Sequence, residues 1–181
     1  GGMGGMGSRS QPVPTTQYKL SCSLEDLYQG VTKRLKVTRR RSANNPQGSA
    51  TEKILTVEVK PGWKAGTKLT YAGEGDEMPD GRAKNIEIII EEQSHGTFRR
   101  DSHDLHLNLN LSLVEALTGY ERTIKTLDGR NLRIADKKVT RPNQEARFPR
   151  EGMPIAKQPG TKGDLILHFN VEFPRSLTEE Q

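Results

Sequence analysis

The chain has 181 residues, enough for one large domain or two small ones. Hydrophobic residues make up 31% and aromatic residues 5%, which is thin for one compact globule and favours two small units. The net charge of +5 and the pI near 9.4 favour acidic partners, whether nucleic acid, acidic peptides or anionic lipids. Cys22 is the only cysteine, so an internal disulfide and a thiolate zinc cluster are excluded.

The chain begins with GGMGGMGSRSQPVP, and we expect residues 1–16 to be a flexible leader because Gly and Pro dominate and nothing can pack. It lacks the charged and then apolar pattern of a secretory signal, and no apolar run in the chain reaches membrane-spanning length. We therefore expect a soluble, cytoplasmic protein, unless a leader was cut off.

The next predicted element is a short helix. Ser23 is a capping residue, Asp26 occupies the capping-box position, and Gly30 closes about two turns with a left-handed conformation. A basic strand follows, with six Lys or Arg residues between Lys33 and Arg41. Alternation places Lys33, Leu35 and Val37 on one face of this strand and Lys36 on the other.

Strict alternation continues along the chain. TEKILTVEVK and KNIEIIIEE, the latter with Ile86, Ile88 and Ile90 on one face, predict half-buried strands of antiparallel sheets. Between them lies KPGWKAGTKLTYAGEGDEMPDG, whose Gly and Pro residues mark hairpin turns. We expect Trp63, the only tryptophan, to plug one end of the first sandwich; an exposed binding role is the alternative.

The second half of the chain repeats the first. After the polar joint SHGTFRRDSHD comes the strand DLHLNLNLSL, then a second capped helix from Ser112 to Gly119 with Glu115 at the capping-box position, a second basic strand, and the strand GDLILHFNVEF. The alternation in DLHLNLNLSL and GDLILHFNVEF again predicts half-buried strands of antiparallel sheets. The sequence therefore predicts a mainly β fold of two tandem small β-sandwich domains, residues 17–95 and 96–175, each with one short helix. Ser176 and Glu179 predict that residues 176–181 begin a helix that the sequence cuts short.

Catalytic and metal-binding motifs are missing from the sequence. It has no nucleophile elbow and no phosphate-binding loop, and its carboxylates are scattered along exposed strand faces. His103 and His106 flank Asp104, but no third strong metal ligand is evident. We therefore expect a solvent-exposed strand edge there and no metal site. We predict a protein that is not an enzyme and holds neither metal nor cofactor.

The basic strand carries the main functional hypothesis. One interpretation is a charged edge strand that resists aggregation. The other is an apolar strip rimmed by cations, which takes an extended acidic and apolar peptide by strand addition. Nucleic acid is the rival partner, but it favours stacking aromatic residues, and only Tyr18 and Tyr28 lie nearby. A purely structural scaffold would bind neither.

Several long motifs resemble the C-terminal substrate-binding region of DnaJ-family co-chaperones. The resemblance runs from about Tyr18 to Leu177 and rests on SLEDLYQG, TKRLKV, VKPGWKAGTKLTYAGEGDE, EEQSHGTFRRDSHDL, SLVEALTGY, IKTLDGR and EGMP. The cysteine-rich zinc module of the first class is missing, so the chain resembles the second class. The J-domain is missing too, and GGMGGMG looks like the tail of the Gly-rich linker that follows a J-domain.

This resemblance implies a groove in the first domain that binds apolar segments of unfolded client proteins. The matching groove positions are Tyr18, Leu20, Leu35, Val37 and Ile88. It also implies that Lys33 and Lys36 hold the acidic C-terminal tail of the seventy-kilodalton heat-shock chaperone, and that a C-terminal helix forms a homodimer. Relatives commonly have Phe where Leu35 and Ile88 stand, which implies a shallower groove here.

Overall fold

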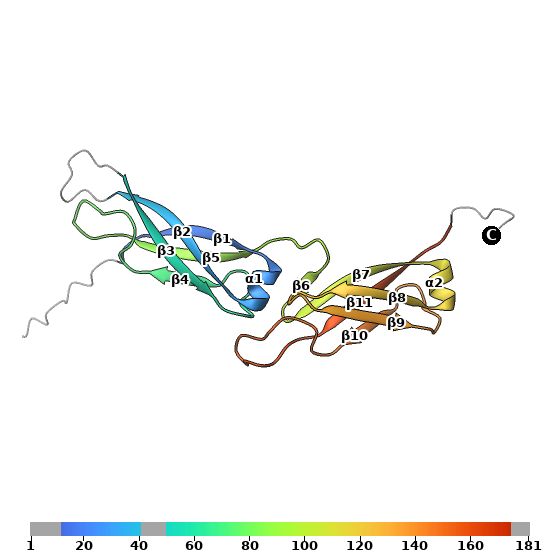
Figure 1. Ribbon diagram of the computed structural model, residues 1–181. Coiled ribbons are helices and arrows are strands. Elements are labelled where there is room, and N and C mark those ends of the chain that lie inside the picture. The colour runs from blue at the N-terminus through green and yellow to red at the C-terminus, as the bar shows by residue number, and fades with distance from the viewer. Residues whose placement is uncertain (1–11, 41–49, 175–181) are drawn as a thin grey trace, which may run out of the picture. The chain divides into compact units, whose positions relative to one another are not determined.

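A computed structural model describes residues 12–40 and 50–174 (Figure 1). Within these residues the chain forms eleven strands and two short helices, which confirms the mainly β fold with one short helix in each repeat. The elements of the first repeat are β1 (Thr15–Cys22), α1 (Leu24–Gln29), β2 (Val31–Arg40), β3 (Ala50–Val59), β4 (Lys68–Tyr71) and β5 (Asn85–Glu92). Those of the second are β6 (Arg99–Asp101), β7 (Asp104–Ser112), α2 (Leu113–Thr118), β8 (Tyr120–Lys125), β9 (Asn131–Asp136), β10 (Glu145–Phe148) and β11 (Leu165–Glu172).

The described residues group into two compact units whose borders differ from those of the sequence repeats. Unit 1 contains residues 12–20, 34–40, 50–56 and 66–90. Unit 2 contains residues 21–33, 57–65 and 91–174, so helix α1 belongs with the second repeat. The domain boundary between residues 95 and 96 stays a prediction, while the predicted helix at 176–181 and most of the leader lie outside the described residues.

Both helices have the predicted capping boxes. In α1 the Asp26 amide donates to Ser23 Oγ and the Ser23 amide donates to the Asp26 carboxylate, each at 3.1 Å. Ser112 and Glu115 repeat this exchange in α2, at 3.1 and 3.2 Å. The closing glycines differ from the prediction: Gly30 has φ 79° and ψ 148°, which is outside the left-handed helical region. An extended ψ feeds the chain directly into β2, and only glycine adopts this combination readily.

Unit 1 has its core between the inward faces of two sheets. The strand order is β1-β5-β4 in one sheet, and β2 pairs with β3 in the other. Ile88 lies opposite Leu69 in the antiparallel pair of β4 and β5. The alternation in β5 is as predicted, since Ile86, Ile88 and Ile90 are all at most 1% exposed.

Unit 2 contains the sheet β10-β11-β7-β6 and the hairpin of β8 and β9. Here one expectation is wrong, because β7 and β11 run parallel along their whole length, with Leu105 opposite Leu165 and Ser112 opposite Glu172. Alternation predicts which face of a strand is buried but carries no information on the direction of its partner. The long strand β7 and the last strand β11 therefore meet at the centre of this sheet.

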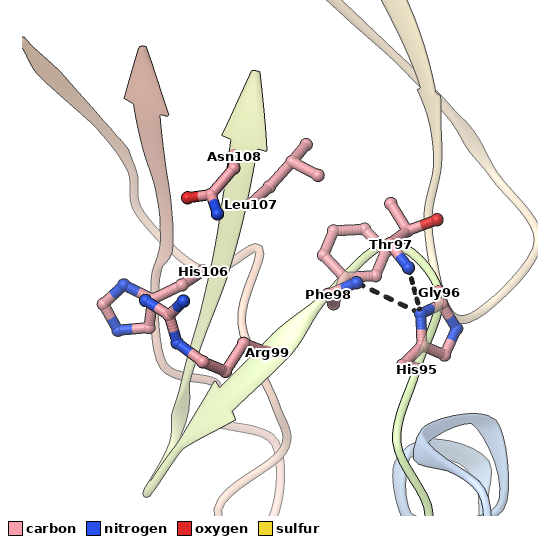
Figure 2. A pocket seen from close by; sticks show the side chains of 8 residues that line it. All are labelled: His95, Gly96, Thr97, Phe98, Arg99, His106, Leu107 and Asn108. Carbon is pink, nitrogen blue, oxygen red and sulfur yellow. Dashed lines mark hydrogen bonds between the residues drawn. The ribbon is translucent and has the colours of Figure 1, made fainter. Parts of the chain in front are cut away.

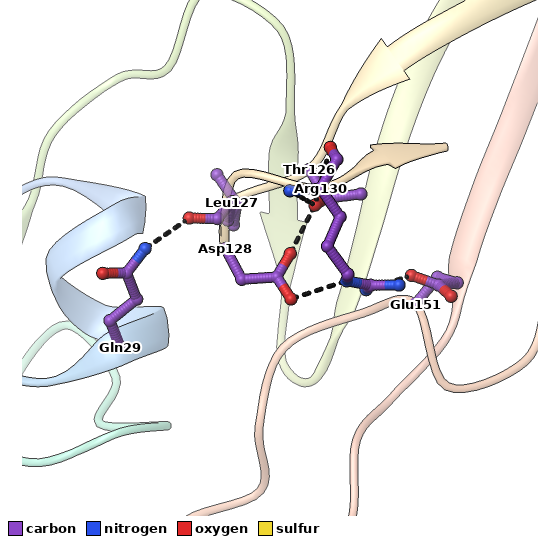
Figure 3. A network of polar contacts seen from close by, with 6 residues as sticks. All are labelled: Gln29, Thr126, Leu127, Asp128, Arg130 and Glu151. Atoms are coloured by element: carbon purple, nitrogen blue, oxygen red, sulfur yellow. Dashed lines mark hydrogen bonds and ion pairs between the residues drawn. The ribbon is translucent and has the colours of Figure 1, made fainter. Parts of the chain in front are cut away.

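The turn of the β8–β9 hairpin is fixed by polar contacts within unit 2 (Figure 3). The Arg130 guanidinium contacts Asp128 at 2.7 Å and Glu151 at 2.8 Å, and the Thr126 hydroxyl donates to Asp128. Gln29, at the end of α1, donates to the Leu127 carbonyl at 2.8 Å. This last bond joins α1 to the second repeat and helps to explain why α1 belongs to unit 2.

A buried arginine makes a further contact between the repeats within unit 2. Arg100, whose side chain is 3% exposed, donates to the Trp63 carbonyl at 2.7 Å and to the Gly62 carbonyl at 3.1 Å. Burial lowers the pKa of Arg100, and the Glu92 carboxylate 3.9 Å away partly offsets this. Gly62 has φ +88°, and a Cβ there would lie 2.6 Å from the Pro154 carbonyl oxygen. The turn at Gly62 is thus packed directly against the second repeat.

Candidate functional site

The predicted groove residues lie on three strands of unit 1, but they differ in depth. Tyr18 on β1 and Leu35 on β2 are half-buried, and Leu20 is 8% exposed. Val37 is 1% and Ile88 0% exposed, so both side chains belong to the core and offer no open surface to a ligand in this structure. Alternation placed Leu35 with Val37 and Ile88 with Ile86, but it fixes only the face of a strand and not the depth at each position.

The basic strand β2 pairs with only one other strand among those described, and its second edge has no strand partner, although Arg40 at its end hydrogen-bonds to Asp76 and Glu77. It pairs with β3 and forms a two-stranded sheet. An edge strand presents main-chain donors and acceptors that an extended peptide can pair with. Along β2 the inward-facing Lys33 and Leu35 alternate with the exposed Arg34 and Lys36. The strand therefore combines an open main-chain edge, a half-buried apolar side chain and cations on both faces.

The two candidate tail-binding lysines have different surroundings. Lys33 belongs to unit 2, where its ammonium lies 3.1 Å from the Asp26 carboxylate and donates to the Ser21 carbonyl at 2.7 Å. Lys36 is 62% exposed and lies 2.8 Å from Glu52. An ammonium has three donors, so Lys33 retains one for a further acceptor beyond these two partners.

Asp26 is tied to this ammonium electrostatically. Burial raises the pKa of its carboxyl, but hydrogen bonds from the Ser23 backbone and from Lys33 outweigh burial, and the net pKa is below the ordinary value. Asp26 is therefore a carboxylate at neutral pH. It holds the Lys33 side chain beside the end of β1.

The second repeat has an equivalent ion pair that the sequence reasoning missed. Arg122 on β8 forms a bidentate contact with Glu115, at 2.9 Å from Nη2 to Oε1 and closer still from Nη1 to Oε2. Arg122 and the Ser112 backbone lower the pKa of Glu115 to about 2. The signal was available, because Arg122 follows Ser112 at the same spacing at which Lys33 follows Ser23. Here both guanidinium arms are occupied by one carboxylate, unlike the ammonium of Lys33.

The aromatic residues and histidines give weaker support to other sites. Tyr28 is only 9% exposed, so of the two aromatic residues near the basic strand only Tyr18 has appreciable exposed surface for stacking on a base. His106 Nδ1 lies 2.7 Å from His168 Nε2 across β7 and β11. Within residues 12–40 and 50–174, no three His, Cys, Asp or Glu side chains gather in a way that could hold a metal ion.

Unit 2 contains a pocket of about 470 Å³ beside β7 (Figure 2). Its walls come from the segment His95–Arg99 and from His106, Leu107 and Asn108. Few apolar atoms are exposed in it, because Phe98 is 5% and Leu107 7% exposed. None of the predicted site residues lies in this pocket. In the part of the chain that the structure describes, no helix is long and apolar enough to cross a membrane.

Comparison with known proteins identifies related sequences. Residues 16–174 match the family described as "DnaJ C terminal domain". The chain is 42% identical over 179 residues to protein psi1 of Schizosaccharomyces pombe, covering 97% of this chain and 47% of psi1. It is 41% identical over 168 residues to protein SIS1 of Saccharomyces cerevisiae, covering 92% and 47%. DnaJ homolog subfamily B member 5 of Homo sapiens is 41% identical over 170 residues, covering 92% and 48%. The chain thus spans about half the length of these relatives.

Proposed function

Because the chain belongs to the DnaJ C-terminal domain family and its relatives are class II DnaJ proteins, we propose that it is the client-binding part of a co-chaperone. It binds exposed apolar segments of unfolded polypeptides along β2 in unit 1. It also takes the acidic C-terminal tail of the seventy-kilodalton heat-shock chaperone, so that clients can be transferred. We propose that the protein binds these partners in the cytoplasm without catalysing a reaction.

The open edge of β2 beside half-buried Leu35 is the observation that carries this proposal. Main-chain pairing to an edge strand is tolerant of sequence, which suits clients that share only their lack of structure. Tyr18 and Leu35 supply apolar contact, with Leu20 at greater depth. Val37 and Ile88 support these side chains from the core, and this departs from the five-residue lining expected from the sequence.

The expected affinity follows from this shallow surface. Full burial of one large apolar side chain contributes about 1.5–3 kcal/mol, and two such client side chains fit the half-buried positions described. Ordering the client and losing its translational freedom cost several kcal/mol. Weak, rapidly exchanging complexes result, and rapid exchange favours transfer of the client.

The acidic tail is proposed to bind at Lys33 and Lys36. Lys33 offers its remaining donor to a tail carboxylate while it keeps Asp26 and the Ser21 carbonyl. Lys36 lies on the opposite face of β2, so a tail that uses both lysines wraps around the strand edge. Lys36 is largely exposed and Lys33 is partly exposed, so both contacts are expected to weaken with salt.

Client binding can be tested with Leu35→Asp, measured by fluorescence anisotropy of a labelled apolar peptide. We expect Leu35→Asp to abolish binding while circular dichroism stays native. The matched control is Thr38→Asp, which places the same charge on the exposed face of the same strand and should bind as the wild type does. Unchanged affinity in Leu35→Asp would show that this strand does not form the client-binding groove.

Tail binding is tested separately with a synthetic peptide that ends in Glu-Glu-Val-Asp. Lys33→Glu should weaken the complex and reduce its salt dependence, and Lys36→Met should have a smaller effect. Equal affinity for wild type and Lys33→Glu at low salt would contradict the proposal that Lys33 holds the acidic tail. Single-stranded RNA of equal charge serves as a probe for the rival nucleic-acid function; saturable peptide binding beside sequence-blind, salt-sensitive RNA binding supports the chaperone function.

We also propose that the full-length protein is a homodimer joined through a C-terminal helix. The predicted start of that helix lies outside the described residues. Apolar side chains near the end of unit 2 support the proposal, since Val114 and Leu117 on α2 are 68% and 55% exposed and Phe173 is 62% exposed. Light scattering of the full-length protein and of a Val114→Asp variant measures the association, and a monomeric full-length protein would contradict it.

A further inference from the structure

His95 is hydrogen-bonded at both ring nitrogens, and all of its partners lie in unit 2. Nδ1 accepts the backbone amides of Thr97 at 3.0 Å and Phe98 at 3.1 Å (Figure 2). Nε2 lies 2.7 Å from the Glu25 carboxylate on α1. The His95 side chain is 18% exposed, so water has only limited access to these bonds.

These partners determine the protonation state of the ring. A nitrogen that accepts a backbone N–H uses its lone pair and carries no proton of its own. Nδ1 faces two such donors, so the proton of the neutral ring is on Nε2, where it is donated to Glu25. The folded arrangement therefore requires neutral imidazole in a single tautomer.

The ring connects two parts of unit 2 that are far apart in sequence. Glu25 is in the first turn of α1, whereas Thr97 and Phe98 lead directly into β6. Phe98 is 5% exposed, and its ring centroid lies 5.5 Å from that of His95. The imidazole thus closes the turn at residues 95–98 and holds it against α1.

We propose that His95 is an acid-sensitive latch, in which protonation of Nδ1 breaks both backbone hydrogen bonds and releases residues 95–98 from α1. The added proton points at two N–H groups that have no lone pair to offer. The turn opens so that the imidazolium can donate to water. The released segment forms one wall of the pocket beside β7, so acidification also opens that pocket.

Charges around the ring act in both directions. Burial raises the pKa of Glu25, but hydrogen bonds from His95 and from the backbone outweigh burial and give a net pKa below the ordinary value, so this carboxylate is charged and attracts an imidazolium. It accepts from Nε2 whether the ring is neutral or charged, whereas Nδ1 loses both its bonds on protonation. The other charged or titratable groups that line the pockets at His95 are Lys125 from β8, Arg99 and Arg100 from β6, His106 from β7 and Glu92 from β5. Three of them are cations and one is a carboxylate.

Amide hydrogen exchange of the Phe98 N–H in the full 181-residue chain tests the latch. Protonation of Nδ1 removes the acceptor of the Phe98 amide, so the latch predicts that the protection factor of Phe98 falls as the pH is lowered from 7.5 to 5.5. The amide of Gln93, which donates to the Cys22 carbonyl, is the internal reference and should keep its protection. A Phe98 protection factor that is constant over this range would overturn the proposal.

His95→Asn separates the role of titration from that of packing. Its amide oxygen can accept the same backbone donors but does not titrate, so Phe98 should stay protected at both pH values. Loss of the pH dependence in this variant supports the latch, and a dependence equal to that of the wild type overturns it. Long-range proton–nitrogen NMR of the wild type needs no substitution: a proton on Nε2 at pH 7.5 supports the latch, and a proton on Nδ1 overturns it.

Discussion

The packing of the turn at Gly62 against the second repeat predicts a large cost for Gly62→Ala. Gly62 has φ +88°, and an alanine in the left-handed region costs about 1–2 kcal/mol. The added Cβ would also lie 2.6 Å from the Pro154 carbonyl oxygen and 2.7 Å from the Ala156 nitrogen. Both are backbone atoms, so the loop must move, and overpacking of this kind costs about 1–3 kcal/mol. The variant should lose about 2–5 kcal/mol in the free energy of unfolding.

Gly160→Ala is the matched control, because Gly160 also belongs to unit 2, has φ +86° and would bring its Cβ within 4 Å of no other group. It isolates the conformational cost of about 1–2 kcal/mol. Urea unfolding followed by the fluorescence of Trp63, the only tryptophan, reads out the region beside Gly62. If the two variants are equally destabilised, Gly62 is not crowded by the loop and the packing described is wrong.

Three further predictions concern the caps and the core. Glu115 has a pKa of about 2 in the folded chain against an ordinary 4.5, so it stabilises the fold above pH 4.5 and loses this contribution as the pH falls to 2. The wild type should therefore lose unfolding free energy in this pH window, and Glu115→Gln should lose less of it. The difference should be at most about 1 kcal/mol, because Arg122 and Glu115 are partly exposed. Ile88→Ala should lower the free energy of unfolding by about 2–5 kcal/mol, measured with urea, with little direct loss of peptide affinity. Leu35→Ala should lower peptide affinity with little loss of stability. Similar stability losses in both variants would contradict the difference in depth. Ser23→Ala should cost about 1 kcal/mol by thermal or urea unfolding through loss of its cap, and Ser21→Ala, which removes no cap, should cost much less.

The sequence was sufficient to predict elements with strong local signals. The capping boxes at Ser23 and Ser112 and the buried face of β5 follow from spacing alone, because short-range geometry determines them. The depth of Val37 and Ile88 could not be predicted in this way, since depth depends on where the opposing sheet lies.

Long-range arrangement was the weaker part of the prediction. The parallel pairing of β7 with β11 and the grouping of α1 with the second repeat depend on contacts between distant residues, such as that of Gln29 with Leu127. Alternation within one strand carries no information about these contacts. The Lys33–Asp26 pair could have been predicted from the repeat, because its counterpart Arg122–Glu115 occupies the same spacing.

The meeting of β7 and β11 has a consequence for biosynthesis. Leu105 at the start of one strand and Leu165 at the start of the other must find each other across some sixty intervening residues. Parallel ribbons of such high contact order close slowly. During translation, the leucines of β7 emerge from the ribosome well before their neighbours on β11 exist. During that interval, a nascent chain of this protein therefore exposes the kind of apolar segment that chaperones protect in other polypeptides.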